Sequence, residues 1–318
     1  MLVLSSEVHI GSYIFKQIGQ VEINSSYETL TDTCTITIPR KLSFKGKSVF
    51  VDKDALFNKG DKVVVKLGYG YDNKQIVFTG FVTRIESGIP TKIFCEDSAY
   101  LLKETKPFNL SYPKLSLDQL LKDILPSGIQ YKLPGEITLG KARFTKVTAS
   151  QILKYLSDKF SINGWFRDST LYMGLNYFPE LQKEHNFHFQ KHVIDNSLEF
   201  VKSEDVKFSV KATSILPDNS KIEVVKGDLE GTERTIHFYN VDKATLEERA
   251  NKALTDFKFD GYAGSFTTFG QPNVQHGDIV NLTDNFFKER SGRYIVKAVQ
   301  TTFGTSGFRQ AIELAERV

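Results

Sequence analysis

The chain has 318 residues, of which 40% are apolar and 25% charged, the balance of an ordinary globular protein with room for two or three domains. Its formal net charge is only +3, and its lysines and arginines are interleaved with acids, so it lacks the concentrated basic face of most nucleic-acid binders. No apolar run approaches the roughly 20 residues of a membrane-spanning helix, and the N-terminus lacks the basic flank of a signal peptide. We therefore expect a protein that is made in the cytoplasm and has no membrane anchor.

Residues 1 to about 105 are predicted to be almost entirely strands. Residues 21–24 and 34–38 alternate apolar and polar side chains, and Pro39 ends the second run because it has no N–H for a strand ladder. Residues 62–67 alternate in the same way after a turn at Gly60. Five or six short strands without a long helix are typical of a small closed β-barrel.

Cys34 and Cys95 both lie in strand-like runs. A disulfide-stapled secreted protein would carry more cysteine pairs than this one. Buried free thiols are therefore favoured over a disulfide bond between the two residues.

Residues from about 106 to 200 are predicted to form an α+β domain inserted between two β domains. Ser116 begins a capping box and starts a helix that Pro126 stops. Thr148 begins a second capping box, and the helix that follows is expected to end at the Asn163-Gly164 pair.

Residues from about 201 to 318 return to strands and are predicted to form a second β-barrel domain. Alternation is clear over residues 206–215, 221–226 and 234–239. One helix is expected over about residues 243–259, with Asp242 or Thr245 as its N-cap. The predicted fold class is therefore mainly β with an α+β insert.

Two stretches of the chain, beginning at Gly60 and Gly277, share one order of features. Each begins Gly-Asp-x-Val, passes through a polar turn to Thr-Gly or Ser-Gly, and continues into an aromatic and β-branched strand. We interpret the residues that mark this pattern as turn and barrel-closure positions rather than catalytic ones, because Asp in a turn bonds its own backbone. They are Gly60, Asp61, Gly80, Gly277, Asp278, Gly292 and Tyr294. One pattern used twice predicts two related small β-barrels in one chain.

Three histidines, His185, His188 and His192, have the spacing to share one helical face and bind zinc. However, Phe187 and Phe189 flank His188 at strand spacing, and a strand would send His185 and His188 to opposite faces. A solvated linker is therefore favoured over a metal site.

Other candidate chemistry is sparse. The acidic pairs Glu96 with Asp97 and Glu247 with Glu248 are interpreted as solvated positions rather than glycosidase carboxylates. No serine-hydrolase elbow, zinc-protease, Walker or Cys-x-x-Cys motif is present in the sequence. We expect no catalytic residue, metal or cofactor. Carbohydrate binding stays open, with aromatic candidates for stacking on sugars at Tyr69, Tyr71 and Trp165.

The order of these features resembles the late control protein D, or baseplate hub, family of contractile phage tails, whose fold also forms the hub part of type VI secretion spikes. Residues 30–39 look like the family's early strand, and residues 60–63, 67–69 and 78–82 look like its first barrel. The most specific part is the ending, at residues 264–266, 277–282, 291–299 and 308–314.

The resemblance implies two Tudor-like β-barrels with an inserted α+β domain, assembled as a homotrimeric ring with pseudo-sixfold symmetry. Such a ring would adapt a sixfold tail tube to a threefold spike, so its partners would be itself, the tube protein and the spike protein. Its lumen would admit the tape-measure protein or DNA. The protein would then be a structural, non-enzymatic part of the virion tail baseplate of a phage, a prophage or a phage-like contractile injection system.

The sequence also departs from some members of that family. It shows no β-helix needle, glycine-rich spike repeat, lysozyme or peptidase domain, so we expect the spike and any wall-degrading enzyme to be separate proteins. Two alternatives remain. One is a tail-associated cell-wall hydrolase or glycan-binding tail protein, which the aromatic content favours, and the other is a tail-tube or tail-completion β-protein.

Overall fold

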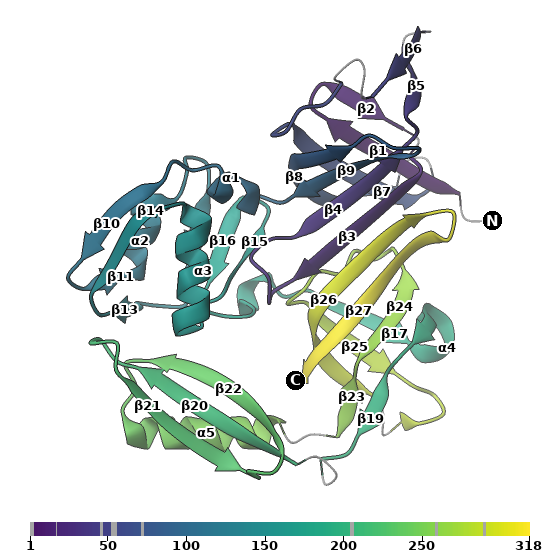
Figure 1. The fold of residues 1–318 in the computed structure, drawn as a ribbon. Coiled ribbons are helices and arrows are strands. Elements are labelled where there is room, and N and C mark those ends of the chain that lie inside the picture. The colour runs from purple at the N-terminus through teal and green to yellow at the C-terminus, as the bar shows by residue number, and fades with distance from the viewer. Residues whose placement is uncertain are drawn as a thin grey trace.

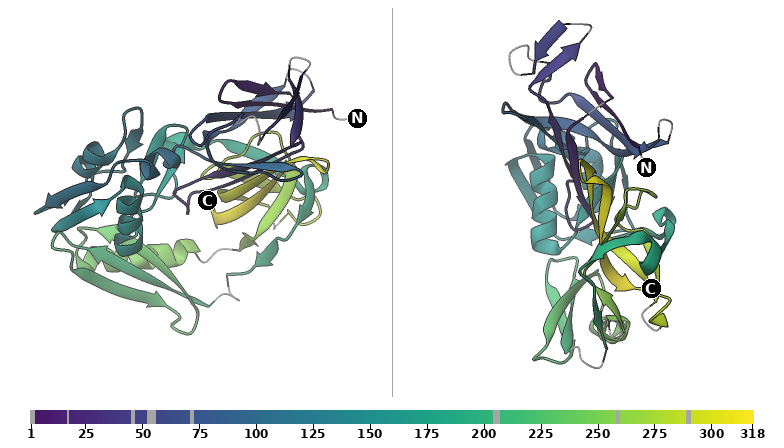
Figure 2. Two further views of the ribbon diagram at one scale, coloured as in Figure 1. Left: turned by 45° about the horizontal axis from the view of Figure 1, so that its top comes forward. Right: turned by 90° about the vertical axis from the view of Figure 1, so that its right-hand side faces the viewer.

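The fold is mainly β, which confirms the predicted class, and Figure 1 shows its strands in several groups with a few short helices. The structure is a computed structural model that describes residues 3–16, 18–44, 47–51, 56–70, 73–203, 207–257, 260–288 and 291–318. Two β modules lie against each other, an α+β unit lies beside them, and a smaller outer unit completes the chain. Figure 2 shows the first module and the outer unit at opposite ends of the molecule.

The first β module spans residues 4–96. Its strands are β1 (Leu4–Ile10), β2 (Tyr13–Phe15), β3 (Gln20–Ser26), β4 (Thr33–Ile38), β5 (Lys41–Phe44), β6 (Lys47–Phe50), β7 (Lys62–Tyr69), β8 (Lys74–Glu86) and β9 (Thr91–Glu96). Every second side chain of β4 is buried, because successive side chains of a strand point to opposite faces. The sheet curves so that Val8 of β1 and Ile23 of β3 are buried in one core.

The second β module combines two distant segments, residues 184–201 and 261–317. Its elements are β17 (Glu184–His188), α4 (Phe189–His192), β18 (Val193–Asn196), β19 (Glu199–Val201), β23 (Gly261–Ala263), β24 (Ser265–Phe269), β25 (Ile279–Thr283), β26 (Gly292–Gly304) and β27 (Gly307–Arg317). β17 pairs with β25, β18 with β24, and β19 with β23. We therefore propose a domain division that assigns residues 184–201 to this module, although the sequence groups them with the insert.

One sheet runs through both modules, because β3 pairs antiparallel with β26. The strand order is β18-β24-β27-β26-β3-β4-β9-β8-β7-β1-β2, with β17 and β25 attached beside β26. Phe303 and Phe308 of the second module are buried in the core of the first. The Tyr69 hydroxyl donates a hydrogen bond of 2.6 Å to the Phe308 carbonyl across the same boundary. Backbone hydrogen bonds and a shared apolar core therefore fix the two modules together.

The α+β unit spans residues 99–173 and has its own large apolar core. Its elements are α1 (Ala99–Lys103), β10 (Phe108–Tyr112), β11 (Leu115–Ser116), α2 (Leu117–Ile124), β12 (Gln130–Lys132), β13 (Thr138–Leu139), β14 (Ala142–Val147), α3 (Ala149–Phe160), β15 (Gly164–Arg167) and β16 (Thr170–Met173). A single 3-10 turn, η1 (Pro179–Leu181), then leads back to the second module.

Local signals define both of the unit's longer helices at their N-termini. The Ser116 hydroxyl accepts from the Gln119 N–H, and Thr148 forms the predicted capping box with Gln151. The end of α3 differs from the prediction. Ser161 adopts a left-handed conformation with φ 55° and caps the helix before the Asn163-Gly164 pair. The Ser157 hydroxyl donates to the Asn163 side chain at 2.6 Å, so a local hydrogen bond accompanies the earlier stop.

The outer unit spans residues 208–257. It consists of β20 (Phe208–Ile215), β21 (Lys221–Gly227), β22 (Thr232–Tyr239) and α5 (Lys243–Phe257), and α5 packs on the three-stranded sheet through Leu246 and Ala250. Asp242 is the N-cap, since its carboxylate accepts from the Thr245 N–H at 3.1 Å. The predicted last two residues of this helix, 258 and 259, lie outside the described residues.

The outer unit docks on the α+β unit. The Gly140 N–H donates to Asn219 Oδ1 at 2.8 Å, and the Tyr239 hydroxyl donates to the Phe160 carbonyl at 2.9 Å. The sequence assigns these strands to the second β-barrel domain, whereas the structure gives them a separate sheet. Within the part of the chain that the structure describes, no helix has both the length and the apolarity to cross a membrane.

Candidate functional site

The Gly-Asp turns that begin the repeated pattern have the same backbone conformation in both modules. Gly60 has φ 89° and Gly277 has φ 82°, a left-handed region that favours glycine. Asp61 and Asp278 follow directly, and each of their carboxylates accepts a hydrogen bond from the backbone N–H three residues earlier. These bonds measure 2.8 Å from Asn58 and 3.0 Å from Gln275.

The same backbone hydrogen bonds tie both turns to the long strand of their module. In the first module, the Gly60 N–H donates to the Val82 carbonyl at 2.8 Å and the Val82 N–H donates to the Asp61 carbonyl at 2.9 Å. In the second, the Gly277 N–H donates to the Val296 carbonyl at 2.7 Å and the Val296 N–H donates to the Asp278 carbonyl at 2.8 Å. Val82 and Val296 are therefore structurally equivalent.

An irregularity in the ladder also repeats. The pairing of β8 with β9 shifts between Val82 and Arg84, and that of β26 with β27 shifts between Val296 and Ala298. A β-bulge is a local feature that bends its strand, so its recurrence at equivalent positions indicates one module used twice.

This register corrects the equivalence read from the sequence. Gly80 lies opposite Val63, and the residue opposite the matching Val280 is Tyr294 rather than Gly292. The Thr-Gly and Ser-Gly pairs are therefore offset by two residues in space. An offset of two keeps every side chain on its own face of the sheet, so the sequence pattern cannot detect it.

The other residues that mark the repeated pattern, Gly80, Gly292 and Tyr294, lie where neighbouring atoms leave little space. A Cβ on Gly80 would lie 2.1 Å from the Glu96 carbonyl oxygen, so the close approach of β9 to β8 requires glycine here. A Cβ on Gly292 would lie 2.9 Å from the Tyr294 hydroxyl. Tyr294 is fully buried, and its hydroxyl accepts a hydrogen bond of 2.9 Å from the Tyr262 N–H.

The second turn carries an additional contact that the first lacks among the described residues. Asp278 is buried, and its carboxylate accepts from the Lys183 N–H at 3.3 Å and contacts His185 Nε2 at 3.0 Å. Asp278 therefore also anchors the segment that enters β17. His185 and His188 lie on a strand, as the phenylalanine spacing indicates. Within the described ranges, no group of three histidine, cysteine or acidic side chains could hold a metal ion.

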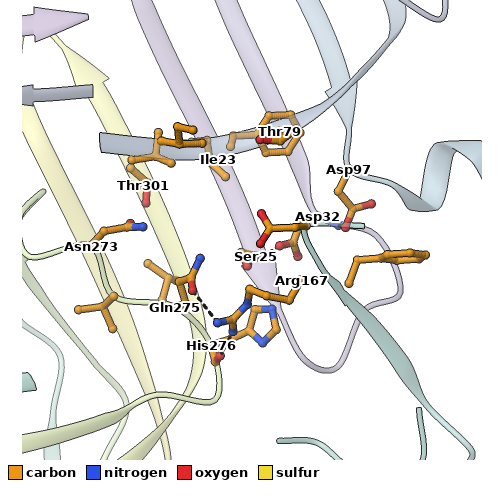
Figure 3. Close-up of a pocket in the computed structure, with 17 residues that line it drawn as sticks. Ile23, Ser25, Asp32, Thr79, Asp97, Arg167, Asn273, Gln275, His276 and Thr301 are labelled. Atoms are coloured by element: carbon orange, nitrogen blue, oxygen red, sulfur yellow. Dashed lines mark hydrogen bonds between the residues drawn. The ribbon is translucent and has the colours of Figure 1, made fainter. Parts of the chain in front are cut away.

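A polar cluster missed by the sequence analysis lies where the two modules meet the α+β unit (Figure 3). Asp32 comes from the first module and Asp97 directly follows its last strand. Arg167 comes from β15, and Gln275 and His276 precede Asp278. They line a cavity of about 90 Å³. Arg167 donates to Gln275 Oε1 at 2.5 Å and to the His276 carbonyl at 2.8 Å. The cluster thus connects three parts of the chain.

Burial dominates the electrostatics of this cluster. It raises the pKa of Asp32 to about 6, although Ser25 and the Ser26 N–H donate to that carboxylate. Burial, with the nearby negative charge of Asp32, also raises the pKa of Asp97 well above its ordinary range. Burial and the charge of Arg167 lower the pKa of His276 to about 3, so this imidazole is neutral at physiological pH.

The position of Asp97 corrects the expectation that Glu96 and Asp97 are both solvated. Asp97 is buried, and its carboxylate accepts from the Asp32 N–H at 3.1 Å and the Ala99 N–H at 2.9 Å. These bonds join β4, β9 and the start of α1. The only signal in the sequence is an acid directly after a buried strand, which also fits an exposed loop.

The two aromatic candidates for sugar binding that the structure describes, Trp165 and Tyr69, are not arranged as an open platform. Trp165 is buried and stacks on Tyr172 with ring centroids 4.7 Å apart. Tyr69 is half-buried at the boundary between the modules, next to Phe308. Tyr71 lies outside the described residues. Cys34 and Cys95 lie opposite each other on β4 and β9 and are buried free thiols, which confirms the prediction.

No known family profile and no curated protein sequence matches this chain. Several solved structures are similar to this chain in fold. A tail protein from Neisseria meningitidis matches over 99% of this chain and 97% of its own, with a TM-score of 0.65 and 16% identity. The 43 kDa tail protein of prophage MuSo2 from Shewanella oneidensis matches over 98% and 97%, with a TM-score of 0.61 and 15% identity.

A third match extends beyond phage tails. The E. coli c3393 protein, a component of the type VI secretion system with structural similarity to bacteriophage T4 tail proteins, has a TM-score of 0.56 and 8% identity. The alignment covers 97% of this chain and 76% of that one. Because the identities are low, these likenesses concern the fold. The protein has the fold shared by these phage tail proteins and by this type VI secretion component, as its resemblance to the baseplate hub family implies.

Proposed function

We propose that the protein is the structural hub of a phage-like tail baseplate and works as a homotrimeric ring. The observation that carries this proposal is the repeated β module, with its matching Gly-Asp turns, hydrogen bonds and bulge, fused edge to edge through β3 and β26. Three copies of a chain with two similar modules would present six similar faces around one axis. Closed symmetry of this kind would adapt a sixfold tube to a threefold spike.

The resemblance to the baseplate hub family implies the partners of such a ring. The tail tube protein would bind one side and the spike protein the other, and the lumen would pass the tape-measure protein or DNA. Phage tail proteins and a type VI secretion component share this fold over most of their chains, which supports a place in the virion tail or a related injection machine. The polar cluster supports a structural role, because its hydrogen bonds join three parts of the chain.

Light scattering on the purified protein tests the ring. We expect a mass about three times the 36.0 kDa of one chain, and six-lobed particles in electron micrographs. A monomer at tens of micromolar would contradict the proposal. Peptidoglycan zymography tests the hydrolase alternative on the same sample, and we expect no clearing.

A further inference from the structure

The two β modules have equivalent strands as well as equivalent turns. The matching strands can be identified one after another across the sheet from the residues that pair. The shared bulge makes β8 equivalent to β26, with Ile85 matching Val299, since these residues face Ile93 and Ile312. Those two partners in turn face Ile36 of β4 and Phe266 of β24. β4 and β24 are therefore equivalent strands.

The next strand outward is β3 in the first module and the segment formed by β18 and β19 in the second. Val21 faces Ile36, and Asn196 faces Phe266. Further along, Asn24 faces Thr33, and Glu199 faces Ala263. Both pairs give the same register, so residues 195–201 are equivalent to β3.

Within one chain, the outer edge of β3 is covered by β26. β3 pairs with β26 over residues 21–26, which lie opposite residues 303–298 in antiparallel order. Across this junction Gln300 Nε2 donates a hydrogen bond of 3.0 Å to Glu22 Oε1. Val299 and Ile23 are buried there, with 4% and 5% of their surfaces exposed.

Within the part of the chain that the structure describes, the equivalent edges of β19 and β8 lack such a cover. Among the described strands, β19 pairs only with β23, and the part of β8 beyond Val82 pairs only with β9. Ile85 and Leu198, which match the buried Val299 and Ile23, are only half-buried. Ile89, three residues after the end of β8, is 86% exposed.

We propose that the end of β8 (residues 84–86) of one copy adds antiparallel to β19 of the next copy, so that the junction between chains repeats the junction of β3 with β26 within a chain. The occupant of this edge is a second copy because the in-chain junction already shows the matching pair of strands. The inference rests on the proposed ring and names the strands that close it. Pairing here would satisfy exposed backbone groups that otherwise invite unwanted association.

If the junction between chains has the register of β3 with β26, it also brings charged side chains of two copies together. It sets Arg84 diagonally across from Glu199 of the neighbouring copy, along the same diagonal that Gln300 and Glu22 use within the chain. Glu86 would face Glu199 directly, and it already pairs with Arg84 on its own strand. Arg84 would then lie between two carboxylates and neutralise their repulsion.

Paired cysteines test the register. In Glu86→Cys/Glu199→Cys the new thiols face each other only across the junction between copies, so mild oxidation should give covalently linked dimers and trimers on a non-reducing gel. The matched control is Asn24→Cys/Gln300→Cys, the equivalent pair within one chain, which should oxidise while remaining a monomer band. Each single-cysteine variant should give no trimer, and Cys34 and Cys95 are buried and unreactive in this assay.

The outcomes separate the inference from the proposed function. A trimer by light scattering whose paired cysteines do not cross-link overturns the strand junction and leaves the ring standing, whereas a monomer overturns both. A charge exchange gives a second measurement: Arg84→Glu should weaken the trimer about tenfold or more, and Arg84→Glu/Glu199→Arg should restore it. Failure of the double variant to recover, with an unchanged circular dichroism spectrum, also counts against the junction.

Discussion

Single residues in this protein act mainly by allowing close approach or by holding a buried charge. Gly80 permits β9 to approach β8 closely, where a methyl group would lie 2.1 Å from the Glu96 carbonyl oxygen. Asp32 and Asp97 bring two carboxylates into one cluster, where backbone N–H groups donate to both and the charge of Arg167 favours the ionised form of Asp32. Both effects are local, and each gives a direct test.

Gly80→Ala should lower the free energy of unfolding by about 3 kcal/mol, because the contact is with backbone and cannot relax by a side-chain rotation. Chemical denaturation measures the change. Gly135→Ala is the matched control, since nothing lies within 4 Å of a Cβ there, and it should change stability by less than about 0.5 kcal/mol. Equal effects of the two substitutions would contradict this close approach.

The acidic pair should make stability depend on pH. Both carboxyl groups have raised pKa values in the folded chain, so their contribution is fully present below about pH 4, the ordinary pKa of aspartate, and is lost as pH rises through about 6. The free energy of unfolding should fall by up to about 1.4 kcal/mol per pH unit for each extra proton that the folded state binds.

Urea unfolding at several pH values between 4 and 8 checks this dependence. Asp97→Asn should flatten the slope, since it removes one of the two titrating groups, even though it also loses a hydrogen bond. Asp158→Asn, at an exposed position on α3, should leave the slope unchanged. A wild-type slope that matches that of Asp97→Asn would refute the role of the pair.

At the scale of elements, the repeated unit is a Gly-Asp turn followed by three antiparallel strands. The turn is bonded to an interior residue of the long strand, Val82 or Val296, and the bulge that follows this residue bends the strand. The two copies differ in what the aspartate holds. Asp61 ties down its own turn, whereas Asp278 also holds the approach to β17 and contacts His185.

Asp278→Asn should therefore destabilise the protein more than Asp61→Asn does. We expect about 3 kcal/mol for Asp278, which is buried with several donors, and about 1 kcal/mol for Asp61, which accepts one backbone bond. Parallel denaturation curves of the two variants give the comparison. Similar losses would mean that the contact with the β17 segment adds no stability.

At the scale of the whole molecule, the two modules behave as one body because β26 and β27 reach into the first module. Phe308 is fully buried in the first core, and its carbonyl accepts from Tyr69. The α+β unit is attached through the polar cluster, and the outer unit is attached in turn to the α+β unit. A rigid pair of modules is what a hub ring requires.

Phe308→Ala should cost about 3–5 kcal/mol and weaken the coupling between the modules. Calorimetry should then show a lower and broader transition than in the wild type. Phe286→Ala, at a phenylalanine that is 77% exposed, should leave the transition close to that of the wild type. A sharp transition in Phe308→Ala at the wild-type temperature would show that this contact does not couple the modules.

Short-range signals in the sequence were sufficient to predict the class of fold, the N-caps of the helices and the presence of a repeat. Ser116 and Thr148 cap their helices with groups only three residues away, and alternation along β4 reports its own buried face. Such interactions depend on neighbouring residues, so the linear pattern carries them.

Which strands and side chains come together over long sequence distances was decided only by the tertiary structure. Residues 184–188 join β25 from nearly a hundred positions away, and the two-residue offset between Gly80 and Gly292 leaves every side chain on the same face. Likewise, Asp97 becomes buried because Asp32 and Arg167 approach from distant segments. The sequence by itself determined that one β module occurs twice, whereas long-range pairing decided how the two copies join and which edges they leave open.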